Sequence, residues 1–142
     1  MKIAAFLAMI TMALMSGCAD HDEQSGRPVQ GLWGNEKISL EMSFSETVRD
    51  PLTGTGIRFS DVTDSRCPQD ITCLLPGKVQ AHLDIIRNEK VISSFTISSG
   101  EQIESFVNQQ SFIFTFSAVT PDTRSTEGRK ENYTITLEVE PE

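Results

Sequence analysis

The chain has 142 residues and a formal net charge of −8, with 20 Asp and Glu against 12 Lys and Arg. This length suits a single domain and is too short for two of ordinary size. Nucleic acid and anionic lipid attract clusters of Lys and Arg. The acidic composition therefore argues against nucleic-acid binding and against docking of the folded domain on anionic lipid.

The first seventeen residues are organised like a secretory signal peptide. Lys2 supplies positive charge, an apolar run covers residues 3–15, and the small residues Ser16 and Gly17 precede Cys18. The apolar run is shorter than the roughly 20 residues that a membrane-spanning helix needs. An ordinary signal peptide followed by a chance cysteine is the alternative interpretation.

Residues 15–18 resemble the lipobox of bacterial lipoproteins, which reads Leu or Val, then Ala, Ser or Thr, then Gly or Ala, then Cys. Met15 departs from this pattern. The resemblance implies that Cys18 is acylated, that cleavage occurs before it, and that its acyl chains bind the membrane. Two or more such chains hold a protein stably where one does not. Ala19, rather than Asp, implies the outer membrane of a Gram-negative cell, with the protein facing the periplasm.

Cleavage before Cys18 removes Lys2 and leaves 11 Lys and Arg against 20 Asp and Glu, a net charge of −9. Residues 18–36 are mostly polar and contain three Gly and one Pro, so we expect an acylated N-terminus and a flexible tether. A flexible chain of about 18 residues typically reaches about 20–25 Å. Leu32 and Trp33 interrupt the polar composition. They either dock on the domain as the start of its first strand or form an anchor for a partner.

Residues 37–142 show alternation of apolar and polar side chains with a period of two, which predicts strands with one buried face. The alternating segments are 40–44, 57–59, 79–85, 91–97, 112–118 and 133–139. Turn-forming residues separate them, and Arg87-Asn88-Glu89 predicts a hairpin between the third and fourth segments.

Only Glu101 to Gln110 hints at helical spacing, with Ile103, Phe106 and Val107 on one side, and we expect one or two helical turns there. Many short strands with frequent turns favour an all-β fold. We therefore expect a single antiparallel β-sandwich, or a small barrel, of about six to eight strands.

Acylation of Cys18 would leave an even pair, Cys67 and Cys73, in an oxidising compartment where disulfides form. A bridge between them closes a ring of seven residues and stabilises the fold by about 2.4 kcal/mol in the chain-entropy model. Two cysteines with only His21 and His82 in the chain do not complete a zinc site. A thioredoxin-type redox pair would have two residues between the cysteines, not five.

The cysteines lie in a longer motif. Residues 64–68 read Asp-Ser-Arg-Cys-Pro, and Phe59, Val62, Cys73 and Gly77 stand at fitting distances. This pattern resembles a group of small exported bacterial proteins, many of them lipoproteins, over roughly residues 38–140. Leu75 and Pro76 stand where that group usually has Trp and Ala. The resemblance supports an exported β-domain and implies no established activity.

The candidate binding residues lie in the loop over residues 61–77. They are Asp64, Ser65, Arg66, Gln69, Asp70 and Ile71. Asp and Ser accept backbone N–H bonds in turns and Arg pairs with carboxylates, so one interpretation is a loop fixed for structural reasons alone. Another is a recognition surface, and the direction of the Ile71 side chain bears on it. A third is a calcium site formed by Asp61, Asp64 and Asp70, although Arg66 would oppose a cation there.

No catalytic or cofactor-binding motif is present, and His82 falls on the polar side of its strand. We therefore expect no enzyme and no cofactor. The favoured function is a lipid-anchored envelope protein whose β-domain binds a partner or has a structural role. The alternative is an inhibitor of an envelope hydrolase or protease that acts through the disulfide loop. The expected partners are the membrane, through the acyl chains on Cys18, and an unidentified envelope protein.

Overall fold

The computed structural model describes residues 26–124 and 129–142. The predicted signal peptide over 1–17 and the predicted lipidation of Cys18 lie outside these residues. Nine strands and one short 3-10 turn make up the described part. They are β1 (Arg27–Pro28), β2 (Ile38–Ser43), β3 (Thr47–Arg49), β4 (Thr55–Asp64), β5 (Val79–Arg87), β6 (Lys90–Ser98), β7 (Gln102–Val107), β8 (Gln110–Thr120), η1 (Lys130–Asn132) and β9 (Thr134–Pro141).

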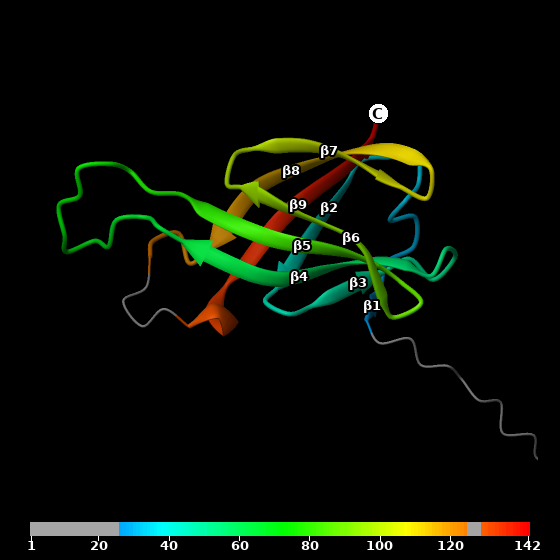
Figure 1. Cartoon of the computed structure of the whole chain (residues 1–142), viewed down its shortest axis with the longest axis horizontal. Helices are drawn as coiled ribbons and strands as arrows, with labels where there is room; N and C mark the ends of the chain where they lie inside the picture. Colours follow the sequence, from blue (N-terminus) through cyan, green and yellow to red (C-terminus); the bar gives the residue numbers. More distant parts are fainter. Residues whose placement is uncertain (1–25, 125–128) are drawn as a thin grey trace, which may run out of the picture.

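The strands form two sheets. One contains β1-β3-β4-β5-β6 in that order, and the other contains β2-β9-β8-β7. All neighbouring strands are antiparallel except β1 and β3, which are parallel. The sheets lie over one another (Figure 1), and residues from both form one buried core. They do not close into a barrel, so the barrel alternative is wrong and the all-β arrangement is sandwich-like.

The core is built from the alternation that the sequence shows. In β5 the side chains of Val79, Ala81, Leu83 and Ile85 are buried, while the residues between them are half-buried. Rings from opposite sheets meet in the middle, where Phe95 of β6 and Phe114 of β8 have centroids 4.9 Å apart. Burial of such side chains drives the packing of the two sheets, at about 25 cal/mol for each Å² of apolar surface.

The six predicted strand segments correspond to β2, β4, β5, β6, β8 and β9. The predicted hairpin is also present, because β5 and β6 pair through a turn at Asn88 and Glu89, both with positive φ. Positive φ at both turn residues matches the twist of the flanking strands. The strands β1, β3 and β7 were not expected, and the first two are only two and three residues long.

The helical expectation for Glu101 to Gln110 is wrong. Residues 102–107 form β7, which pairs with β8 through a turn at Asn108 and Gln109. The three apolar residues of the supposed helical face have different environments. Val107 is buried, Ile103 is half-buried and Phe106 is 71% exposed. Pairing with β8 therefore outweighs the weak helical spacing.

Leu32 and Trp33 are buried in the core, and the indole Nε1 of Trp33 donates a hydrogen bond to the carbonyl oxygen of Thr55 at 2.9 Å. They dock on the domain, as one interpretation expected, but in a turn rather than at the start of a strand. The anchor for an external partner is therefore not available at these positions. The packed domain begins no later than β1 and includes residues assigned to the tether from the sequence.

Candidate recognition loop

A loop of residues 65–78 joins β4 to β5 and extends well beyond the end of the two sheets (Figure 1). The strands that it joins are direct neighbours, with Asp64 paired to Val79. We call Asp64 to Arg66 together with Gly77 and Lys78 the loop base, and residues 69–76 the loop tip. The loop base is polar and extensively hydrogen-bonded, whereas the loop tip exposes apolar side chains.

The Asp64 carboxylate is the centre of the loop base. It accepts hydrogen bonds from the Arg66 guanidinium, with Nη2 at 2.7 Å and Nε at 3.0 Å, and from the Tyr133 hydroxyl at 2.7 Å. The backbone N–H of Arg66 adds another at 2.9 Å. Burial opposes ionisation of this carboxyl, but the hydrogen bonds from Arg66 and Tyr133 outweigh it and lower the pKa of Asp64.

Arg66 extends this network to a second segment. Its Nη1 and Nη2 donate to the carbonyl oxygens of Asp122 at 2.5 Å and Pro121 at 2.9 Å, just after β8. The hydrogen bond to Asp64 raises the pKa of Arg66, so the guanidinium remains charged. Charge-assisted bonds of this kind are stronger than neutral ones. Arg66 therefore holds the base of the loop to the chain between β8 and β9.

Ser65, Gly77 and Lys78 close the loop base. The backbone N–H of Ser65 donates to the Lys78 carbonyl at 3.0 Å, and the Lys78 N–H donates to the Ser65 hydroxyl at 3.0 Å. Gly77 lies so close to this contact that a Cβ atom added to it would stand 1.7 Å from the Ser65 carbonyl oxygen. Only glycine fits at this point unless the backbone moves.

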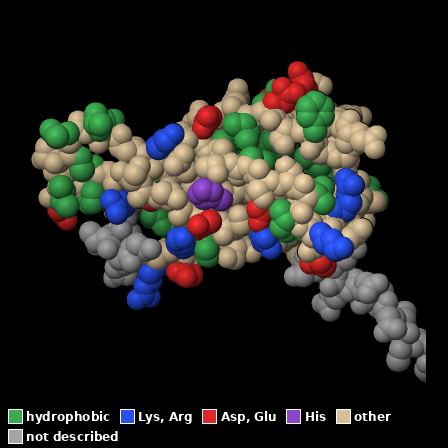
Figure 2. Space-filling model, viewed as in Figure 1, with side chains coloured by type: hydrophobic (Ala, Val, Ile, Leu, Met, Phe, Trp, Pro, Cys, Tyr) green, Lys and Arg blue, Asp and Glu red, His purple; other side chains and the backbone are tan. Residues whose placement is uncertain are grey.

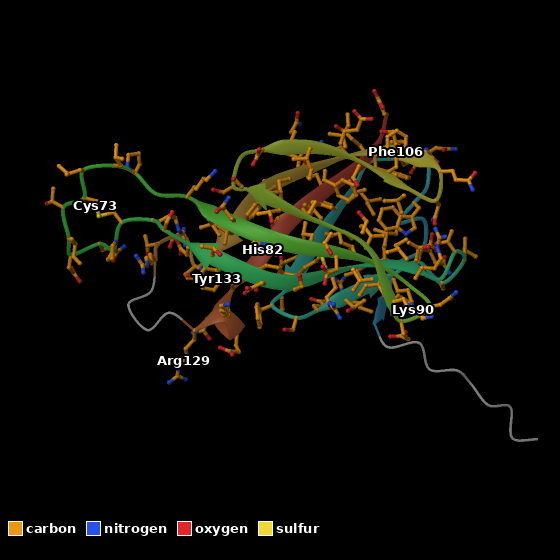
Figure 3. All side chains as sticks on the ribbon, in the orientation of Figure 1. Cys73, His82, Lys90, Phe106, Arg129 and Tyr133 are labelled. Carbon is orange, nitrogen blue, oxygen red and sulfur yellow. A yellow bond between two sulfur atoms is a disulfide. The ribbon has the colours of Figure 1, made fainter. Side chains whose placement is uncertain are left out.

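The predicted disulfide between Cys67 and Cys73 is present, with Cα atoms 5.9 Å apart. It closes the first half of the loop beside Pro68, whose carbonyl accepts a hydrogen bond from the Ile71 N–H at 3.2 Å. Cys73 lies near the far end of the protrusion, as Figure 3 shows. The bridge thus restrains the part of the loop that receives least support from the sheets.

The loop tip exposes its apolar side chains. Ile71 is 60% exposed, Leu75 is 80% exposed and Leu74 is completely exposed. Figure 2 shows hydrophobic side chains gathered on this protruding end of the molecule. Gln69 and Asp70 are also exposed. Exposed apolar clusters on rigid elements mark sites of interaction more often than isolated apolar residues do.

The six candidate residues therefore separate into two groups. Asp64, Ser65 and Arg66 belong to the loop base, and Gln69, Asp70 and Ile71 belong to the loop tip. Sequence reasoning missed Leu74 and Leu75. Two features of the sequence could have indicated them. Leu74 and Leu75 are adjacent apolar residues outside any alternating segment, and Leu75 stands where the resembled group usually has Trp.

The three carboxylates of the calcium alternative are not brought together. Asp61 pairs with Lys130 at 2.5 Å, a hydrogen bond that lowers the pKa of Asp61, while Asp64 is engaged by Arg66. Asp70 lies exposed in the loop tip. Among the described residues, no cluster of three or more His, Cys, Asp or Glu side chains has the arrangement of a metal site. The structure thus offers no support for calcium at this loop.

His82 lies on the outer face of β5, near the middle of the molecule in Figure 3. Its ring nitrogens face the hydroxyls of Thr96 at 2.9 Å and Thr63 at 3.4 Å. The Ser60 hydroxyl donates to the backbone carbonyl of His82 rather than to the ring. These are cross-strand contacts on an open sheet surface, and they give His82 a role in holding neighbouring strands together.

No family model, curated protein or solved structure matches this chain. The resemblance to small exported bacterial lipoproteins therefore stays a prediction from the sequence. Across residues 26–124 and 129–142, no helix is long and apolar enough to span a bilayer.

Proposed function

We propose that this chain is a bacterial envelope lipoprotein, anchored through acyl groups on Cys18, whose β-domain is a non-catalytic binding module. The recognition element is the loop tip. The proposed location is the outer membrane, with the domain in the periplasm. The lipobox-like residues Ser16, Gly17 and Cys18 support the anchor, and Ala19 supports the choice of membrane.

One observation carries the binding role: three aliphatic side chains are exposed on a loop whose base is held by hydrogen bonds and whose tip is held by a disulfide. A structural loop alone would gain stability by covering Ile71, Leu74 and Leu75. Restraining the loop in advance also reduces the entropy lost on binding. Exposure combined with restraint is the expected property of a recognition surface.

The position of the loop agrees with this role. The described chain begins beside β1, at one end of the long axis, and the loop protrudes from the opposite end (Figure 1). A protein held by acyl groups at Cys18 would therefore present the loop tip at the end of the domain distant from the site where the tether enters.

The second candidate is an inhibitor of an envelope hydrolase or protease. The exposed side chain of Ile71 favours it, because Ile71 lies inside the seven-residue ring closed by Cys67 and Cys73. A rigid ring with an outward apolar side chain can occupy an enzyme cleft with little ordering cost. Inhibition of an envelope protease by the purified domain, lost in an Ile71→Ser variant, would establish this candidate.

The binding role is tested by placing a photoreactive amino acid at position 75 in the full chain and irradiating living cells. We expect adducts, with protein or lipid, from position 75. The matched control carries the same residue at position 52, because Leu52 is 82% exposed on the turn between β3 and β4. Equal adduct yields from the two positions, or none from position 75, would contradict the proposal.

The anchor is tested separately. A Cys18→Ser variant should lose labelling by radioactive fatty acid and should leave the membrane fraction. Full retention of this variant with membranes would remove the lipoprotein part of the proposal while leaving the loop untouched.

A further inference from the structure

The loop tip has the composition of a lipid-facing surface. Among the described residues, seven large apolar side chains are exposed, and Ile71, Leu74 and Leu75 are three of them. All three are aliphatic, and residues 69–76 contain no Trp, Tyr or Arg. Those three residue types dominate the energetic centres of protein interfaces, where Leu is under-represented. A bilayer requires only apolar area, which the tip supplies.

The shape of the loop tip also favours a bilayer as its partner. The tip is a convex protrusion with its apolar side chains spread over its outer surface (Figures 1 and 2). A protein partner would need a deep apolar cleft to cover a protrusion, whereas a bilayer accommodates one without complementary shape.

Charge at the loop end differs from that of the remaining domain. Arg66 ties residues 121–124 to the loop 65–78, and Lys130 ties residues 129–132 to Asp61 at the end of β4. With Asp61 and Asp64, the ion-pair partners of Lys130 and Arg66, this loop end contains five Lys and Arg against five Asp and Glu, a net charge of zero. The other described residues contain six Lys and Arg against 11 Asp and Glu, a net charge of −5. The whole-chain charge, which argued against docking on lipid, therefore does not describe this end. Anionic head groups would repel the acidic remainder of the domain more strongly than the neutral loop end, so the loop end is the part that can approach a membrane.

We propose that the loop tip inserts Ile71, Leu74 and Leu75 into the interfacial region of the phospholipid bilayer that holds the acyl groups of Cys18. This inference rests on the proposed function and names the partner of the same surface. Insertion would bury the aliphatic side chains among acyl chains, with Lys78 near the phosphates. The loop base is hydrogen-bonded within the domain, so the tip enters without unfolding the strands behind it.

Two attachment points define an orientation. Seven residues, 19–25, lie between Cys18 and Gly26, the first described residue, and eight steps of at most about 3.5 Å along the chain span at most about 28 Å. The first described residues and the loop tip lie toward opposite ends of the long axis (Figure 1), so a short tether to an acyl anchor, together with tip insertion, would lay the domain along the membrane. The anchor raises the effective concentration of the tip at the surface, and weak insertion then suffices.

The experiment measures co-sedimentation of the complete mature chain, residues 18–142 with Cys18→Ser, with sucrose-loaded vesicles. One set contains phosphatidylcholine, and the other contains phosphatidylethanolamine and phosphatidylglycerol. A single myristoyl chain binds with a constant of about 10⁴ M⁻¹, and three aliphatic side chains offer a comparable amount of hydrocarbon. We expect half of the protein to bind at or below about 1 mM lipid, without a preference for anionic vesicles because the loop end carries no net charge.

The Leu74→Ser, Leu75→Ser double variant should bind at least tenfold more weakly. A Leu52→Ser variant should change binding by less than twofold, since Leu52 lies near the opposite end. Binding to neither vesicle, or equal binding by the wild type and the double variant, would overturn the inference. Adducts to a protein from position 75 in cells, without vesicle binding, would overturn the lipid partner while leaving the binding module intact.

The choice of bilayer has its own readout. Acylated protein is bound to small vesicles, and light scattering reports whether the vesicles cluster. If the tip inserts into the same bilayer that holds the acyl groups, the vesicles stay separate and the scattering is unchanged. Clustering of vesicles that depends on Leu74 and Leu75 would show insertion into an opposing membrane and overturn this assignment.

Discussion

The strand β5 is entered and left through two very different connections. It is entered through the loop 65–78, fourteen residues long, and left through a turn of two residues, Asn88 and Glu89. Both connections join neighbouring antiparallel strands, β4 with β5 and β5 with β6. Two residues are sufficient for such a connection. Joining β4 to β5 therefore does not require the twelve additional residues of the loop 65–78.

The longer connection also contains more internal structure than a passive insertion requires. Its base carries a partly buried carboxylate with an Arg and a Tyr partner and a glycine in close contact with backbone, and a disulfide restrains its tip. Long loops are tolerated at low entropic cost, so length alone implies little. Fixing a long loop while leaving its apolar tip exposed is the feature that distinguishes it, and such loops are usually functional.

The largest expected effect on stability comes from Gly77→Ala. The new Cβ would stand 1.7 Å from the Ser65 carbonyl oxygen, so the backbone of the loop base must move. We expect a loss of about 3 kcal/mol or more in the free energy of unfolding, measured by urea denaturation. The control is Gly100→Ala, where a Cβ meets nothing within 4 Å and only the positive φ of 79° opposes the change. It should cost about 1 kcal/mol.

The next effect comes from Asp64→Asn. Because the variant weakens the bonds with Arg66 and Tyr133 in a partly buried site, we expect a loss of about 2–3 kcal/mol at pH 7. Tyr133→Phe removes one hydrogen bond and should cost about 1 kcal/mol. A loss in Asp64→Asn no larger than in Tyr133→Phe would show that the carboxylate is not the centre of the loop base.

The same carboxylate predicts a pH dependence. The folded state lowers the pKa of Asp64, so its stabilising contribution is complete above the ordinary value of about 3.9. That contribution disappears as the pH falls through the lowered folded value. Denaturation between pH 6 and pH 2 should therefore show a smaller acid-induced loss in Asp64→Asn than in the wild type. Parallel curves would assign the acid sensitivity to other carboxylates.

Removal of the disulfide should have a smaller effect. The Cys67→Ser, Cys73→Ser double variant loses a bridge that closes a ring of seven residues, worth about 2.4 kcal/mol in the chain-entropy model. The domain should still fold, because the loop base and the core do not depend on the bridge. Intact mass after alkylation, with and without reductant, establishes whether the native protein holds the bridge. Two freely alkylated cysteines in protein from the periplasm would contradict it.

Six strands were predictable from the sequence, while the short strands β1 and β3 and the edge strand β7 were not. Alternation over 79–85 and 112–118 reflects one buried face, and β5 and β8 have that face. β7 shows no such regularity, because its apolar Phe106 lies on the exposed face beside the buried Val107, and its place is decided by pairing with β8. β1 is held by pairing with β3, whose residues lie 21 positions further along the chain, and no local pattern indicates such a contact.

The candidate loop was predictable in position but not in its division into base and tip. The Asp64-Arg66 pair is local and could be proposed from spacing. The partners Tyr133, Pro121 and Asp122 are more than 50 residues distant, so only the fold reveals them. The exposure of Leu74 and Leu75 also depends on where the loop points.

The smallest expected effect on stability separates the loop tip from the loop base most directly. Leu74 and Leu75 are at least 80% exposed, so replacing both with Ser removes almost no buried apolar surface. The free energy of unfolding of this double variant should stay within about 0.5 kcal/mol of the wild type, as for other exposed positions. Differential scanning calorimetry would measure it beside Ile57→Ser, which places a hydroxyl in the core and should destabilise strongly. A loss above about 1 kcal/mol in the tip variant would mean that the tip packs against the domain. The exposed leucines would then be part of the fold rather than a surface kept for a partner.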